Sequence, residues 1–194
     1  MSTLELQAQP PPEVVLKTTK LAKSELERFI TLLGAFGEVH APVARDGGFA
    51  FQELTDWREA RLDYTRTILP PKKYVLPPKE ELFHFDADAG YVAPADPPGR
   101  MVLFGVHPCD VYGLNILDEV FEGRYPDPYF RARRKAIAVV GVDCVPDEHC
   151  FCRSMRADFV DHGFDLFLYD IGADYLVLVG TALGDDMVLA GKEI

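Results

Sequence analysis

The sequence lacks the short motifs by which many enzymes are identified. It has no GxGxxG or GxxxxGK[ST] loop for a dinucleotide or a phosphate, and no GxSxG or HExxH segment. It also has no apolar run near the roughly 18–20 residues that span a bilayer. The opening MSTLELQAQPPPE has neither a basic nor an apolar signal-peptide region. These absences predict a cytoplasmic protein without a catalytic motif of its own.

Basic residues are also in deficit. The chain has 20 Lys and Arg against 31 Asp and Glu, which gives a formal net charge of −11. Nucleic acids and anionic membrane surfaces are bound mainly through Lys and Arg, so neither is expected as a partner.

Cysteine is scarce but unevenly placed. Of four cysteines, Cys144, Cys150 and Cys152 lie in VDCVPDEHCFCRSM, and Cys109 lies upstream in GVHPCD. Disulfides are rare in a reducing cytoplasm, so clustered cysteines there indicate metal ligands.

The hydrophobic pattern predicts one α/β domain over residues 13–194, after a flexible N-terminal arm at residues 1–12. In the first half we expect a strand and a helix with a Ser24–Glu27 capping box. A hairpin is expected where RDGG separates EVHAPVA from GFAFQEL.

The second half predicts a mixed sheet with a parallel strand–helix–strand unit. Residues 101–106 and 136–142 have the composition of buried strands, and a helix capped by Asp110 is expected between them. The segment RYPDPYFRARR is expected to be a loop, with RARRK either solvated or a docking face for an acidic redox partner. Strands at 165–169 and 175–179 are expected to form a hairpin.

This topology predicts where the cysteines meet. Cys109 and Cys144 each follow the end of a predicted parallel strand, so both lie at the carboxyl edge of the sheet, where α/β proteins usually build their sites. Cys150 and Cys152 return to the same edge through a short loop. Four thiolates suit either an iron–sulfur cluster or zinc. The spacing Cys-x5-Cys-x-Cys fits no common zinc knuckle and favours a [4Fe-4S] cluster, with zinc kept as the alternative.

Other residues near the cysteines are candidates for supporting roles. His107 and His149 flank cysteines and are either solvated or ligands in a Cys3His site. Phe151 can exclude water, and Ser154 can donate a hydrogen bond. Lys72 and Lys73 lie either in a solvated loop or in a basic clamp beside an anionic cofactor.

Several segments, in this order, resemble a known family. They are LPPKKYVLPPKEELFHF, GVHPCDVYGLNILDEVF, DPYFRARR, VDCVPDEHCFCRSM and GFDLFLYDIGADYLVLVG. Together they resemble the iron–sulfur beta subunits of cytoplasmic nickel–iron hydrogenases, the sulfhydrogenase or sulfur reductase type, and a related iron–sulfur component of anaerobic sulfite reductase. The resemblance covers about residues 65–181.

The resemblance implies an accessory, electron-transferring subunit of a multisubunit oxidoreductase. It implies that Cys109, Cys144, Cys150 and Cys152 hold one cluster. It also implies partners: a flavin–NAD(P)H subunit, a catalytic subunit and a ferredoxin-like iron–sulfur subunit. Family members usually continue into a ferredoxin-like region with two further clusters, whereas this chain has no cysteine after Cys152. It also has Arg156 after the Ser-Met pair, where the family tends to have glycine.

The alternative is a zinc-stabilised structural or interaction subunit of a multisubunit complex. Less favoured is a cluster-bearing enzyme with its own substrate pocket.

Overall fold

The structure is a computed structural model that describes residues 17–92 and 99–192. The N-terminal arm expected at residues 1–12 lies outside the described residues. The strands are β1 (Lys17–Ala22), β2 (Glu38–Arg45), β3 (Gly48–Glu53), β4 (His84–Asp86), β5 (Gly90–Val92), β6 (Met101–Val106), β7 (Ile137–Val142), β8 (Leu166–Asp170) and β9 (Asp174–Val179). The α-helices are α1 (Leu26–Leu33), α2 (Pro108–Phe121), α3 (Pro128–Ala136) and α4 (Ala182–Ala190). Short 3-10 helices are η1 (Lys23–Glu25), η2 (Trp57–Glu59) and η3 (Pro71–Tyr74).

Seven strands form the main sheet, in the order β1-β9-β8-β7-β6-β2-β3. The four central strands β8, β7, β6 and β2 are parallel, and antiparallel strands flank them on both sides. The predicted α/β fold with a mixed sheet is therefore confirmed. Both predicted hairpins are also confirmed, β2–β3 and β8–β9.

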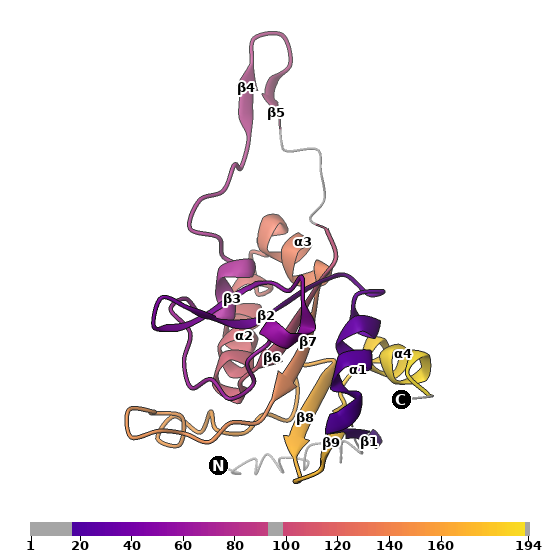
Figure 1. Cartoon of the computed structure of the whole chain (residues 1–194). Helices are drawn as coiled ribbons and strands as arrows, with labels where there is room; N and C mark the ends of the chain where they lie inside the picture. The colour runs from indigo at the N-terminus through magenta and orange to yellow at the C-terminus, as the bar shows by residue number, and fades with distance from the viewer. Residues whose placement is uncertain (1–16, 93–98, 193–194) are drawn as a thin grey trace, which may run out of the picture.

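Helices cover both faces of the sheet. Figure 1 shows α1 and α4 side by side, on the side of the sheet away from α2. Side chains alternate along the central strands: Val102 and Phe104 of β6 join the core under α1 and α4, whereas Leu103 joins the core under α2 and α3. This alternation, with its period of two, is what makes these short apolar runs strands.

A bulge at Gly105 breaks the alternation just before the cysteine segment. The β6–β7 register shifts between Phe104 and Val106, and Gly105 has φ +81°. Val106 consequently packs with Leu103, on the α2 face, although alternation would place it on the other face. The bulge thus sets the direction in which the chain enters α2.

Two sequence predictions about helix starts are wrong. His107 is the N-cap of α2, Pro108 occupies the first turn, and Asp110 lies inside the helix rather than capping it. Glu25 is the N-cap of α1, and its side chain makes no capping hydrogen bond, so the expected Ser24–Glu27 capping box does not start this helix.

The segment expected to be a loop at RYPDPYFRARR contains helix α3. The Asp127 carboxylate caps it by accepting hydrogen bonds from the N–H groups of Tyr129 and Phe130 at 2.8 and 3.1 Å. Its arginines are not a free basic patch. Arg134 pairs with Asp118 at 3.0 Å, and Arg133 pairs with Glu80.

The bulge leads to a prediction about stability. A Cβ at Gly105 would lie 2.9 Å from Cδ2 of Leu62, and its positive φ disfavours any L-residue. We expect Gly105→Ala to lower the free energy of unfolding by about 2 kcal/mol, through backbone strain and overpacking. Gly113→Ala is the control, because a Cβ there meets nothing within 4 Å and alanine favours the helix by about 0.5–1 kcal/mol. Denaturant titrations measure both. Equal stability of Gly105→Ala and the wild type would contradict the role of the bulge.

Candidate metal centre

The two parallel strands at the centre of the sheet place Cys109 and Cys144 as the sequence predicts. β6 and β7 are parallel neighbours that end at Val106 and Val142. Cys109 lies in the first turn of α2, and Cys144 lies just past β7. Cys150 and Cys152 follow in an irregular loop, which we call the cysteine loop (residues 143–165). Figure 1 shows this loop running out beside the sheet before the chain enters β8.

All four cysteines are free thiols of intermediate burial. Burial raises the pKa of Cys109 well above its usual range, and the charges of Asp110, Cys152 and Cys144 add to that effect. Burial raises the pKa of Cys144 to about 11, with further contributions from Cys152 and Cys150. Each thiol therefore lies close enough to its neighbours for its charge to be felt.

The arrangement is a set of neighbouring thiols rather than a closed ligand set. Within the described residues, no group of three or more His, Cys, Asp or Glu side chains is arranged so that it could hold a metal ion. Closing four sulfurs around one centre requires the cysteine loop to move relative to the start of α2. The ligand role of the four cysteines stays a prediction.

The chemistry of the donors nevertheless fits a positively charged centre. A buried thiolate is costly without a cation, and the raised pKa values of Cys109 and Cys144 express that cost. A metal centre offsets it by coordinating the thiolates directly. Cys109 also lies at the N-terminus of α2, where the helix dipole favours negative charge.

His107 lies beneath Cys109 and is not one of the solvated histidines that the sequence favours. It is 2% exposed and stacks on Tyr64, with ring centroids 3.8 Å apart and planes 8° apart. Its Nε2 atom is buried without a hydrogen-bond partner in the described structure. Burial lowers the pKa of His107 to about 4, so the ring is neutral at pH 7.

Tyr64 belongs to this floor, and no pattern in the sequence assigned it to the site. Its hydroxyl donates to the Gly105 carbonyl at 2.8 Å, which ties the floor to the bulge. Beside it, a hollow of about 350 Å³ opens at the carboxyl edge of the sheet. The lining residues are Leu62, Asp63, Tyr64, Thr65, Val142, Asp143, Cys144, Val145, Asp170 and Tyr175.

Asp147 organises the turn before Cys150. Its Oδ1 accepts hydrogen bonds from the His149 N–H at 2.9 Å and the Cys150 thiol at 3.2 Å, and its Oδ2 pairs with Arg66 at 3.0 Å. These hydrogen bonds, the His149 N–H first, lower the pKa of Asp147. The sequence contains a signal for this turn, because aspartate often accepts from the backbone two residues on.

The other predicted supporting residues lie apart from the thiols or face solvent. Phe151 is 76% exposed, and Ser154 and His149 are exposed as well. Lys73 donates to the Phe51 carbonyl at 2.5 Å, whereas the charge of Lys72 acts on Asp110. Lys72 is thus the one of these two lysines that borders the cysteine segment. The roles proposed for Phe151, Ser154 and the lysines stay predictions.

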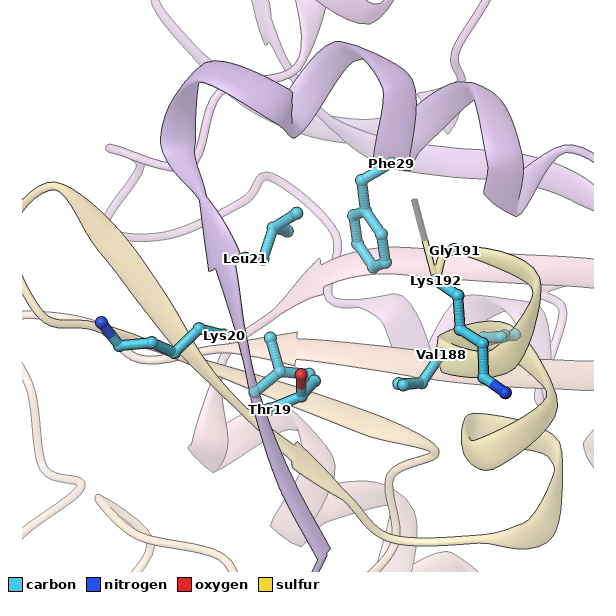
Figure 2. Close-up of a pocket in the computed structure, with 9 residues that line it drawn as sticks. Thr19, Lys20, Leu21, Phe29, Val188, Gly191 and Lys192 are labelled. Atoms are coloured by element: carbon cyan, nitrogen blue, oxygen red, sulfur yellow. The ribbon is translucent and has the colours of Figure 1, made fainter. Parts of the chain in front are cut away.

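A second pocket lies away from the cysteines. It has a volume of about 200 Å³ and opens between β1, α1 and α4, where Leu21, Phe29 and Val188 line it (Figure 2). The lysines drawn there, Lys20 and Lys192, carry their amino groups away from its apolar centre (Figure 2).

The position of Arg156 explains why a glycine suits the loop there. Arg156 has φ +53°, in the left-handed region where a side chain is strained. We expect Arg156→Gly to raise the free energy of unfolding by up to about 1 kcal/mol, because glycine adopts this backbone without strain. Arg153→Gly is the matched control: this exposed arginine is not among the described residues with positive φ, so its replacement should bring no gain. A gain for both variants, or for neither, in denaturant titrations would contradict the strain.

None of the helices formed by the described residues is long and apolar enough to cross a membrane. No protein-family model and no solved structure matches the chain. Among curated proteins, the chain is 40% identical over 179 residues to the protein named sulfhydrogenase 2 subunit beta from Pyrococcus furiosus. The match covers 92% of this chain and 53% of that protein, so the chain spans about half the length of this relative. Over that shared length, the chain belongs to the sulfhydrogenase beta-subunit family.

Proposed function

We propose that the chain is an electron-transfer subunit that holds one [4Fe-4S] cluster on Cys109, Cys144, Cys150 and Cys152. The observation that carries the proposal is the gathering of four free thiols, from two neighbouring parallel strands and one loop, at the carboxyl edge of the sheet. The similarity to a sulfhydrogenase beta subunit supports the same interpretation.

The donor set favours a cluster over a single ion. All four candidate ligands are thiolates, the usual ligands of iron–sulfur clusters. His107 is a poor alternative ligand, because it is stacked flat on Tyr64 and almost fully buried. His149 faces solvent, with its Nε2 atom 3.5 Å from the Glu148 carboxylate.

When bound, such a cluster accepts and releases one electron at a time. The chain contributes the environment. The stacked rings of Tyr64 and His107 exclude water beneath Cys109, and Asp147 orients the Cys150 thiol. A dry floor and fixed hydrogen bonds are the means by which a protein tunes a cluster's potential.

The outer face of the cysteine loop suits contact with an electron partner. Val145, Phe151, Met155 and Phe159 are all more than half exposed there. An apolar surface of this kind marks protein–protein interaction sites. We propose that the complex is a cytoplasmic oxidoreductase of the hydrogenase or sulfur reductase type. In it, this subunit relays electrons between a flavin–NAD(P)H subunit and a catalytic subunit, with a ferredoxin-like subunit among its partners.

Metal analysis tests the proposal directly. Anaerobic purification should yield a brown protein with about four iron and four sulfide per chain, whose visible absorption bleaches with dithionite. A colourless chain with about one zinc and no sulfide would instead support a zinc-stabilised structural subunit.

Ligand variants test the four cysteines. We expect Cys150→Ser to lose most of the iron and sulfide and to lower the melting temperature, because metal binding contributes to folding. His149→Ala, next to it in the same turn, should keep its full metal content. Full iron content and an unchanged melting temperature in Cys150→Ser would remove this residue from the ligand set.

A further inference from the structure

A two-stranded hairpin projects from the body of the molecule, away from the cysteines (Figure 1). β4 and β5 pair Phe85 with Tyr91 in antiparallel register, and the hairpin closes on Asp86. The Asp86 carboxylate accepts hydrogen bonds from the N–H groups of Asp88 and Ala89 at 2.9 and 2.8 Å. We call residues 82–92 the arm. The sequence predicted only an exposed loop from Asp86 onward.

The base of the arm is fixed to the body. The Tyr129 hydroxyl of α3 donates to the Leu82 carbonyl, and Arg133 of α3 pairs with Glu80 just before the arm. Arg133 also donates to the Val75 carbonyl at 2.8 Å, so one helix holds both the base of the arm and the segment that leads to it. The arm is therefore a held projection.

The arm exposes apolar side chains rather than hiding them. Phe83, Phe85 and Tyr91 are 54%, 69% and 75% exposed. Tyr91 meets Phe83 and Phe85 edge to face, with ring centroids 5.0 and 5.7 Å apart. A two-stranded hairpin is at best marginally stable in water, and clustered exposed aromatics are typical of interface anchors. Both features indicate that another surface covers the arm.

The charge of the arm selects the kind of surface. Residues 81–92 contain Glu81, Asp86 and Asp88 but no Lys or Arg. A second copy of this chain, with a net charge of −11, would repel an acidic arm. A surface that buries the aromatic rings and pairs with the carboxylates needs an apolar groove flanked by basic side chains.

We propose that the arm docks into an apolar groove with basic flanks on a different subunit of the same complex. This inference rests on the proposed function for the existence of that complex, but not on the identity of the metal. The arm and the cysteine loop then give the chain two separate contact surfaces.

The test uses the complex isolated anaerobically from its native host through a tag on this chain. We expect Phe85→Ser combined with Tyr91→Ser to retain at least tenfold less of one partner subunit than wild type, by quantitative mass spectrometry. Leu189→Ser is the control, because it removes an exposed apolar residue of α4 and should retain every subunit. Iron and sulfide per chain, measured on the same samples, should stay at the wild-type level.

The outcomes separate the two proposals. Wild-type retention of all subunits by the double variant overturns the arm proposal and leaves the cluster untouched. Absence of iron and sulfide from wild type overturns the cluster and leaves the arm test valid. A wild-type homodimer that becomes monomeric in the double variant assigns the arm to a second copy of the chain, which also overturns the proposal.

A charge variant tests the chemistry of the partner. Asp88 contributes its backbone N–H to the turn, so replacing its side chain leaves the turn bond in place. We expect Asp88→Lys to weaken binding of the isolated partner subunit several-fold at low ionic strength, with the difference shrinking as salt is added. Tighter binding of Asp88→Lys, or no change at low salt, would contradict a basic groove.

Discussion

The parallel pairing of β6 with β7 is the constraint on which the candidate site depends. Two neighbouring parallel strands end at the same edge, so the segments that follow them are brought together by backbone hydrogen bonds alone. Cys109 follows one strand and Cys144 follows the other. The crossover through α2 and α3 keeps both strands parallel and covers one face, while α1 and α4 cover the other. Neither thiol could meet the other if either strand ran in the opposite direction.

The elements that could be predicted from sequence are those encoded by local pattern. The apolar runs at β6 and β7 and the turn residues Asp46–Gly47 and Gly172 carry their own signals, and the structure has strands and hairpins there. Helix α3 was missed because its apolar face is little more than Phe130, and distant carboxylates of Asp118 and Glu80 neutralise its arginines. Its start was nevertheless written in the sequence, since Asp127 followed by Pro128 is a favourable N-cap and first-turn pair.

The site was predicted in its cysteines and less well in its surroundings. Strand ends locate Cys109 and Cys144 from sequence alone. The burial of His107 could not be predicted in the same way, because it follows from the bulge at Gly105 and from Tyr64, which is distant in the chain. The left-handed backbone of Arg156 was equally hidden, since arginine is not a residue that signals positive φ. Contacts between distant segments decide these features, and no local pattern encodes them.

The cysteine loop and its metal are best treated as one equilibrium. The loop has no regular strand or helix between β7 and β8, and its buried anchors Ala157, Val160 and Phe164 all follow Cys152. Before Cys152, the described contacts to other segments include the Arg66–Asp147 pair, a surface ion pair worth about 1 kcal/mol or less. The raised pKa values of Cys109 and Cys144 mean that binding releases protons as the thiolates form. Ordering of this half of the loop is therefore expected to come from ligation itself, and this would couple the metal content of the chain to the shape of the surface that the loop presents to an electron partner.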